Sequence, residues 1–185
     1  MQETFVFAGF GGQGVMFAGQ LLAYAALEEG YETTWIPSYG PEMRGGTAHC
    51  YVVISNRPIG SPIVKHPPFA IAFNNPSFLK YETVVAPGGL LAYNESMVTQ
   101  DGHREDIEYL GVPAASLAER AGDMKMLNVV LLGAVLASRP VLPVEAIRRA
   151  LELHLPAKHK AKLEANYRAL ELGAAFAAAR AKQKA

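Results

Sequence analysis

Two glycine-rich segments contain the residue types best suited to bind a ligand. The first is Gly9-Phe10-Gly11-Gly12-Gln13-Gly14, and the second runs from Ser38 to Gly46 with the sequence SYGPEMRGG. Each follows a stretch that predicts a β-strand, and α/β proteins bind ligands beyond the carboxyl ends of their strands. Glycine allows the backbone to approach a ligand closely. Together the two loops predict a binding site more specifically than either does alone.

The first loop has the spacing of an anion-binding turn. Gly9, Gly11 and Gly14 match the pattern GxGxxG, in which backbone N–H groups at a helix start receive a pyrophosphate. A dinucleotide-binding protein also places an acidic residue near the end of its second strand, but that strand ends here in Ile36-Pro37-Ser38. NAD is therefore disfavoured, and glycines that serve only helix-on-strand packing remain an alternative. The candidate contacts in this loop are Gly11, Gly12, Gln13 and Gly14.

The second loop adds charge to the predicted site. The planar guanidinium of Arg44 suits a carboxylate or a phosphate, while Glu42 can hold Arg44 in place or pair with a cation across an interface. A surface ion pair between the two is the alternative, and it would contribute little. The candidate contacts in this loop are Tyr39, Glu42, Arg44, Gly45 and Gly46. The adjacent His49 and Cys50 would point to opposite faces of a strand, so they do not predict a Cys–His nucleophile.

Composition limits the class of protein. The chain has 185 residues, half of them apolar, which predicts a single domain over 1–185. Seventeen basic residues balance seventeen acidic ones, so no overall field attracts nucleic acid. The one cysteine can neither close an internal disulfide nor hold an iron–sulfur cluster. Without a membrane-spanning run or a signal segment, we expect a soluble cytoplasmic chain, and we predict no metal site and no catalytic residue.

Short strand patterns alternate with helical ones, which predicts an α/β fold. From Met124 the pattern is helical almost to the end, with breaks at three prolines and a last helix over 158–182. Asn128 lies in an apolar helix and needs a partner, which we expect to be loop backbone. Gly133 permits a close approach of helices. Strands are predicted over 5–8, 32–37, 49–54, 69–73, 90–93 and 107–112, and further helices from 15, from 76 and over 114–121.

Several of these motifs together resemble the gamma subunit of 2-oxoacid:ferredoxin oxidoreductases. The resemblance spans nearly the whole chain, and the PEMRGG segment favours the 2-oxoglutarate type within a family that includes pyruvate and ketoisovalerate enzymes. It implies oxidative decarboxylation of a 2-oxoacid with coenzyme A, which yields an acyl-CoA, carbon dioxide and reduced ferredoxin. Which 2-oxoacid is used stays open. The residues that carry the resemblance are GFGGQG at 9–14, PSYGPEMRGG at 37–46, Ser55 with Pro58-Ile59 and Ser61-Pro62, Asn128 with Leu132-Gly133-Ala134, and Asn166 with Gly173.

The resemblance also implies partners and a fold. Thiamine diphosphate and Mg belong to alpha and beta subunits, and iron–sulfur clusters to beta and a ferredoxin-like delta subunit, so this chain would bind no cofactor alone. Its implied roles are to cover the active site, to form assembly contacts and to line the coenzyme A entry through the glycine loops, Gln13 and Arg44. The implied fold is a Rossmann-like three-layer α/β domain whose mixed, strongly curved sheet can close on itself, with a C-terminal helical layer.

Two other classes of function stay open at this point. A stand-alone nucleotide-binding oxidoreductase would use the first loop for NAD or FAD. The missing acidic residue after the second strand argues against this class. A non-catalytic interaction subunit would bind no small molecule at all. Self-association of the isolated chain through exposed apolar patches also stays open.

Overall fold

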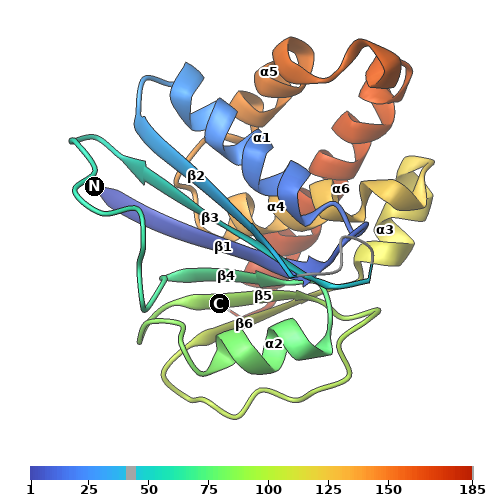
Figure 1. Ribbon diagram of the computed structural model, residues 1–185. Coiled ribbons are helices and arrows are strands. Elements are labelled where there is room, and N and C mark those ends of the chain that lie inside the picture. Colours follow the sequence, from blue (N-terminus) through green and yellow to red (C-terminus); the bar gives the residue numbers. More distant parts are fainter. Residues whose placement is uncertain (41–44, 185) are drawn as a thin grey trace.

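The computed structural model describes residues 1–40 and 45–184, which build one mixed six-stranded sheet with helices on both faces (Figure 1). The strand order is β2-β3-β1-β4-β5-β6. The alternation of strands and helices predicted from the sequence is confirmed. The strands are β1 (Gln2–Phe10), β2 (Glu32–Tyr39), β3 (Thr47–Ser55), β4 (Phe69–Ala72), β5 (Leu90–Asn94) and β6 (Glu108–Val112).

The helices divide unequally between the two faces of the sheet. Helix α2 lies on one face, whereas the N-terminal helix α1 and the C-terminal helices lie on the other (Figure 1). The predicted C-terminal helical layer is therefore confirmed. The helices are α1 (Val15–Glu28), α2 (Asn75–Glu82), α3 (Ala114–Ala121), α4 (Leu127–Ser138), α5 (Val144–His154) and α6 (Leu163–Lys184), with short 3-10 helices η1 (Met124–Met126) and η2 (Ala157–Lys162).

Strand direction decides which loops meet. β3 pairs antiparallel with both β1 and β2, so β1 and β2 run in the same direction although β3 lies between them. β4, β5 and β6 continue the sheet in parallel with β1. The loop after β1 and the loop that joins β2 to β3 therefore lie at the same end of the sheet.

The prediction of a strongly curved, closing sheet is wrong. β2 and β6 form opposite edges of an open sheet, and closure would require these two strands to hydrogen-bond to each other. Helix packing makes closure unnecessary, because α1 and α4 bury the apolar face of the sheet that a barrel would have enclosed. The mixed sheet and the helical layer are the parts of the implied fold that hold.

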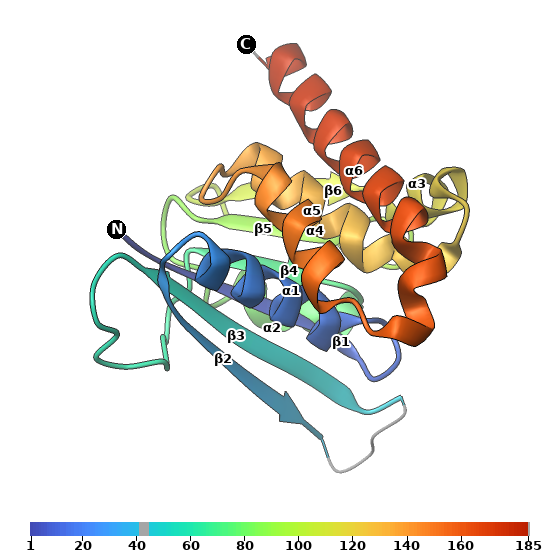
Figure 2. The same cartoon turned by 90° about the horizontal axis from the view of Figure 1, so that it is seen from above.

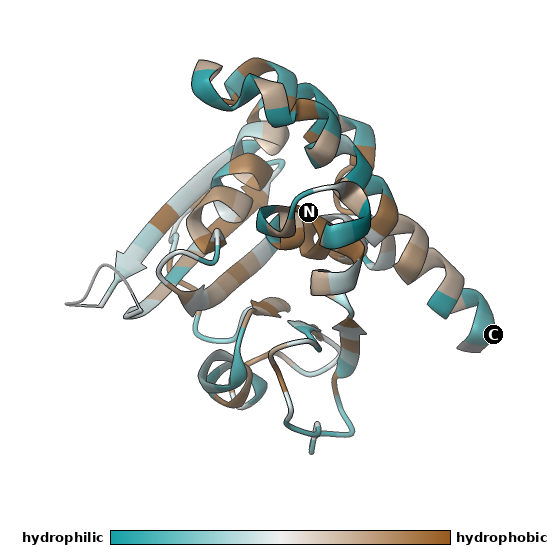
Figure 3. Cartoon of the chain, turned by 90° about the vertical axis from the view of Figure 1, so that its right-hand side faces the viewer, coloured by the Kyte–Doolittle hydropathy of each residue, from teal (hydrophilic) through white to brown (hydrophobic). Residues whose placement is uncertain are grey.

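β1 lies at the centre of the core because both of its faces are covered. Phe5 and Phe7 belong to the larger apolar cluster under α1 and α4, while Val6 and Ala8 belong to a smaller cluster under α2. A strand with two buried faces gives a continuous apolar run rather than an alternating one. That explains the sequence pattern at 5–8, and Figure 3 shows apolar residues gathered where helices face the sheet.

Helices α4 and α6 approach each other to backbone contact. A Cβ atom added at Gly133 would lie 2.2 Å from the Leu170 carbonyl oxygen, and one added at Gly173 would lie 2.0 Å from that of Val130. The predicted role of Gly133 is therefore confirmed. The predicted start of the last helix at 158 is wrong: residues 157–162 form η2, and α6 begins at Leu163 and ends beyond the body of the domain (Figure 2).

Candidate functional site

The two glycine loops are joined directly. The Gly11 N–H of the first loop donates a hydrogen bond to the Gly46 carbonyl oxygen of the second at 3.0 Å. The Gly40 N–H donates to the Thr47 carbonyl oxygen at 2.7 Å, which closes the base of the second loop. Gly12 has φ of 100° and Gly45 has φ of 76°, a left-handed conformation that favours glycine over other residues. The two predicted loops therefore lie side by side, and ligand binding by them stays a prediction.

Helix α1 starts at this junction, and no side chain caps its first turn. Its N-cap residue is Gly14, no side chain accepts a hydrogen bond from the first turn, and no acidic residue lies in that turn. The first N–H groups of a helix have no partner within it, and the helix dipole adds partial positive charge there. The start of α1 therefore offers hydrogen-bond donors to an anionic or polar group.

An open cleft of about 340 Å³ lies over this helix start. Tyr39, at the end of β2, is 54% exposed and forms one side of it. Gly46 contacts the first loop, whereas Gly45 is exposed and does not line the cleft. Glu42 and Arg44 lie outside the described residues. The lining residues are Phe10, Gly11, Gly12, Gly14, Val15, Met16, Phe17, Tyr39 and Ala48.

Gln13 has internal partners. Its Oε1 accepts hydrogen bonds from the Phe10 N–H at 2.7 Å and from Asn74 Nδ2 at 3.1 Å, and its Nε2 lies 3.5 Å from the Phe73 carbonyl oxygen. Asn74 also caps α2 by accepting from the Ser77 N–H at 3.0 Å. The Gln13 amide thus ties the first loop to the β4–α2 turn, and a ligand contact through Gln13 stays a prediction. Sequence reasoning did not pair Gln13 with Asn74, because 61 residues separate them.

Asn128, in helix α4, holds the first glycine loop by a hydrogen bond to its backbone. Its Nδ2 donates to the Gly14 carbonyl oxygen at 3.1 Å, and its Oδ1 accepts from the Val129 N–H at 3.0 Å. The expected bond to loop backbone is confirmed. A Cβ atom at Gly14 would lie 2.4 Å from Asn128 Nδ2, so this contact requires glycine. The C-terminal helical layer therefore fixes the position of the α1 start.

His49 and Cys50 lie on opposite faces of β3, as predicted. Cys50 is buried beneath α1, and burial raises the pKa of its thiol to about 12. His49 lies on the α2 face, where burial and then the charge of Lys80 lower the pKa of its imidazole. An inert thiol on one face and an imidazole on the other cannot act as a nucleophile and its base.

Metal and membrane chemistry can be assessed on residues 1–40 and 45–184. Within these ranges no three His, Cys, Asp or Glu side chains gather as a metal site would require. Cys50 is the only cysteine of the chain and is buried, so its residues do not fit an iron–sulfur cluster. None of the described helices is long and apolar enough to cross a membrane.

A family model named pyruvate ferredoxin/flavodoxin oxidoreductase matches residues 4–176. The chain belongs to this family. It is 34% identical to the 2-oxoglutarate synthase subunit KorC of Methanothermobacter marburgensis, over 84% of this chain and 88% of KorC. It is 41% identical to the ketoisovalerate oxidoreductase subunit VorA of Methanothermobacter thermautotrophicus, over 92% of this chain. That match covers 35% of VorA, so this family member spans about a third of the length of that relative.

Solved structures agree with this family member's fold. The gamma subunit of a keto/oxoacid ferredoxin oxidoreductase from Geobacter sulfurreducens superimposes with a TM-score of 0.82 at 28% identity, over 96% of this chain and 99% of that one. A 2-oxoglutarate:ferredoxin oxidoreductase from Magnetococcus marinus gives a TM-score of 0.85 at 22% identity over 31% of its chain, a likeness of fold. The resemblance to the gamma subunit is confirmed. Because KorC and VorA are both similar, the 2-oxoglutarate subtype stays a prediction.

Proposed function

We propose that the chain is the gamma component of a multisubunit cytoplasmic 2-oxoacid:ferredoxin oxidoreductase. The complex decarboxylates a 2-oxoacid oxidatively with coenzyme A, giving an acyl-CoA, carbon dioxide and reduced ferredoxin. Alpha and beta subunits hold thiamine diphosphate and Mg, and a delta subunit or ferredoxin receives the electrons. This chain assists assembly and contributes to coenzyme A access. Family membership supports the reaction class, and the solved Magnetococcus marinus relative has coenzyme A and succinyl-CoA bound.

One observation carries the role of this chain: the hydrogen-bonded pair of glycine loops beside the uncapped start of α1. Free backbone N–H groups in a cleft suit the phosphates or amides of coenzyme A, or carbonyl groups of a partner subunit. Tyr39 adds an exposed aromatic side chain to the same cleft. We assign the chemical steps to the partner subunits.

The sheet order argues against the alternative of a stand-alone dinucleotide-binding domain. In a dinucleotide-binding fold the first two strands are neighbours, and the ribose lies over the end of the second. Here β3 lies between β1 and β2, and β2 ends in Tyr39 rather than in an acidic residue. Calorimetric titration of the isolated chain with NADH tests this alternative, and we expect no heat of binding.

The assembly is tested by anaerobic affinity purification from the native host, with mass spectrometry of the co-eluting chains. We expect a thiamine-binding subunit and an iron–sulfur subunit, and oxoacid-dependent viologen reduction by the eluate. Comparison of pyruvate, 2-oxoglutarate, branched-chain oxoacids and indolepyruvate then names the substrate. Recovery of the chain alone from an intact lysate would contradict the proposal.

The contribution of the cleft is tested in the assembled complex with Tyr39→Ala and Arg44→Ala. Both should raise the KM for coenzyme A several-fold or weaken assembly, because Tyr39 lines the cleft and Arg44 belongs by sequence to the second loop. The controls are Ser38→Ala and Arg57→Ala, because both side chains are exposed and neither lines the cleft. Unchanged assembly and unchanged KM in both variants would leave a purely structural subunit.

A further inference from the structure

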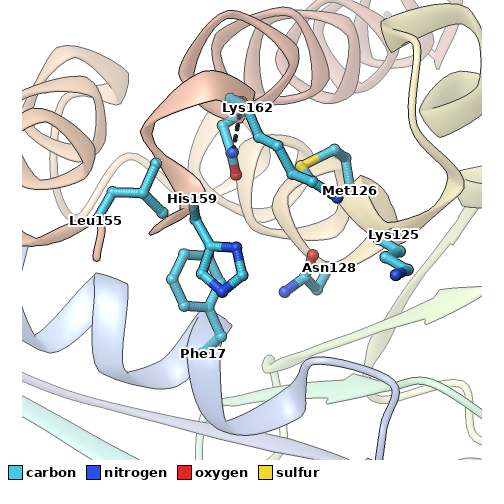
Figure 4. Close-up of a pocket in the computed structure, with 8 residues that line it drawn as sticks. Phe17, Lys125, Met126, Asn128, Leu155, His159 and Lys162 are labelled. Atoms are coloured by element: carbon cyan, nitrogen blue, oxygen red, sulfur yellow. Dashed lines mark hydrogen bonds between the residues drawn. The ribbon is translucent and has the colours of Figure 1, made fainter. Parts of the chain in front are cut away.

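A second pocket, of about 270 Å³, lies beside the α1 start between α1, η1, α4, η2 and α6. Figure 4 shows its labelled side chains reaching a common space from these elements. None of its residues was among the predicted contacts. Asn128 connects it to the glycine loop through the Gly14 carbonyl oxygen. The pocket is lined by Phe17, Lys125, Met126, Asn128, Leu155, His159, Lys162 and Asn166.

Cationic side chains enter this pocket from two separate segments. Lys162 forms an ion pair with Asp123, with Nζ and Oδ2 at 2.7 Å. The Lys125 ammonium makes no hydrogen bond or ion pair within the described residues, although its charge helps to lower the pKa of Asp123 after Lys162 does. Only Lys162 is paired with the Asp123 carboxylate, so the two lysines and Asp123 together carry a net charge of +1. Among residues 1–40 and 45–184, no carboxylate pairs with the Lys125 ammonium.

The remaining lining is apolar or rigid. Phe17, Met126 and Leu155 provide apolar walls. Asn166 is 2% exposed, and its Nδ2 donates to the Lys162 carbonyl oxygen at 2.8 Å, which holds the turn that carries the lysine. Lys125 and His159 are exposed to solvent, but a concave pocket with apolar walls and a few polar groups has the make-up of a ligand site.

The charge and the size select the ligand class. A lysine ammonium acts as a point charge, which suits a phosphate. A carboxylate ligand is better matched by the forked guanidinium group of an arginine, and no arginine is among the residues that line this pocket. A phosphoryl group carries nearly two negative charges at neutral pH and has three strong acceptor oxygens, which suits a pocket lined by two lysines and a histidine. The volume is near the lower limit of typical ligand pockets, about 300 Å³, and so suits one end of a ligand.

We propose that this pocket binds the phosphoryl group of a phosphorylated ligand, with Lys125 and Lys162 opposite its charge and the adjoining part of the ligand against Phe17. Coenzyme A and other nucleotides share this chemistry. The proposal stands on these residues whether or not the glycine loops contact coenzyme A.

Inorganic pyrophosphate is the probe for the test, added to the isotope-labelled full-length chain and followed by amide NMR. We expect saturable shifts in residues 124–129 and 157–166 and no such shifts with acetate. Lys125→Gln should weaken pyrophosphate binding about tenfold, which corresponds to about 1.4 kcal/mol. Lys125 is the informative position because, unlike Lys162, it has no ion pair whose loss could disturb the fold.

Lys158→Gln is the matched control, because Lys158 is exposed on η2 and does not line the pocket. It should bind pyrophosphate like the unmodified chain. Absence of saturable shifts, an unchanged affinity in Lys125→Gln, or an equal loss in Lys158→Gln would each overturn the proposal in favour of general surface charge.

Competition then identifies the source of the phosphoryl group. Displacement of pyrophosphate by coenzyme A would assign the pocket to that co-substrate. Displacement by adenosine 3′,5′-bisphosphate or ATP without displacement by coenzyme A would assign it to another nucleotide. These experiments use no partner subunit, so their failure would leave the proposed function standing, and failure to co-purify partners would leave this pocket standing.

Discussion

Glycines have different structural roles in two regions of this molecule: close helix packing in one and tight turns in the other. In the α4–α6 pair, Gly133 and Gly173 allow two helix backbones to touch, and no other residue fits the space. In the loops at the end of the sheet, Gly12 and Gly45 have open space around them and a left-handed backbone. The first pair serves packing, while the second allows the tight turns of two exposed loops. A glycine count alone therefore says nothing about function; the surroundings of each glycine decide.

Gly14 belongs to both regions. It has φ of 78° at the start of α1, and the Asn128 side chain fills the space where a Cβ atom would lie. Gly14 is therefore the point at which the helical layer contacts the loops. Substitutions along this series should change from effects on stability to effects on ligand handling.

Gly173→Ala should have the largest effect on stability. Its Cβ atom would lie 2.0 Å from the Val130 carbonyl oxygen, a backbone atom that cannot rotate away, so the helices must separate. Overpacking of this kind costs about 3 kcal/mol of unfolding free energy. Urea denaturation measures it. Gly60→Ala, at a position with open space and no left-handed φ, is the control and should change the stability by less than about 0.5 kcal/mol.

Gly14→Ala should cost about 2 kcal/mol of unfolding free energy, from backbone strain and from the lost Asn128 bond. Asn128→Ala alone should cost about 1 kcal/mol, because it removes the same hydrogen bond. A double-mutant cycle by urea denaturation should show coupling above about 0.5 kcal/mol, since truncation of Asn128 relieves the clash. Additive losses would mean that the helical layer does not support the loop.

Gly12→Ala should cost only about 1 kcal/mol of stability, because its φ of 100° is strained for alanine but no atom obstructs the new methyl group. Gly30→Ala is its matched control, with φ of 83° and equally open space at the far end of α1. Both should lose similar stability in thermal melts. Only Gly12→Ala should raise the KM for coenzyme A in the assembled enzyme, and an equal KM in both would remove Gly12 from the cleft's function.

Cys50 should give the smallest effect, a pH dependence of stability. Burial raises its pKa from 9.0 to about 12, so above pH 9.0 the unfolded chain loses a proton that the folded chain keeps. The stability contributed by the protonated thiol is complete below this range and declines as the pH rises through it. One pH unit above 9.0 the loss should be about 1 kcal/mol by denaturant unfolding. Cys50→Ala should show a shallower decline, and an identical decline would contradict the prediction.

The fold was predictable where local pattern and buried surface agree. The apolar run at 5–8, the glycine turn and the helix from 15 gave β1, the loop and α1, and prolines marked the breaks among the C-terminal helices. The open sheet was not predictable, because curvature depends on which edges meet and which helices cover the faces. The start of α6 was missed because residues 157–162 are helical in a tighter form that the same spacing favours.

The candidate site was predictable in part. The loops could be found from their glycines, and Asn128 from the rarity of an amide in an apolar helix. Their joining could not, because it depends on β3 lying between β1 and β2, a pairing between residues about forty positions apart. The pocket at Lys125 and Lys162 was also beyond sequence reasoning, since its lining residues come from separate segments that only the packing of the helices brings together.

The position of β3 also has a kinetic consequence. The cleft needs β1, β2 and β3 in register, and the pairing of β1 with β3 closes a long loop that includes α1 and β2. Contacts between distant parts of a chain form slowly, because the entropy of loop closure is lost before the contacts compensate for it. A chain with a formed cleft has therefore already paired β2, β3 and β1, the three strands on one side of its sheet. A partner subunit that binds at this cleft would therefore bind only copies in which these strands have already paired.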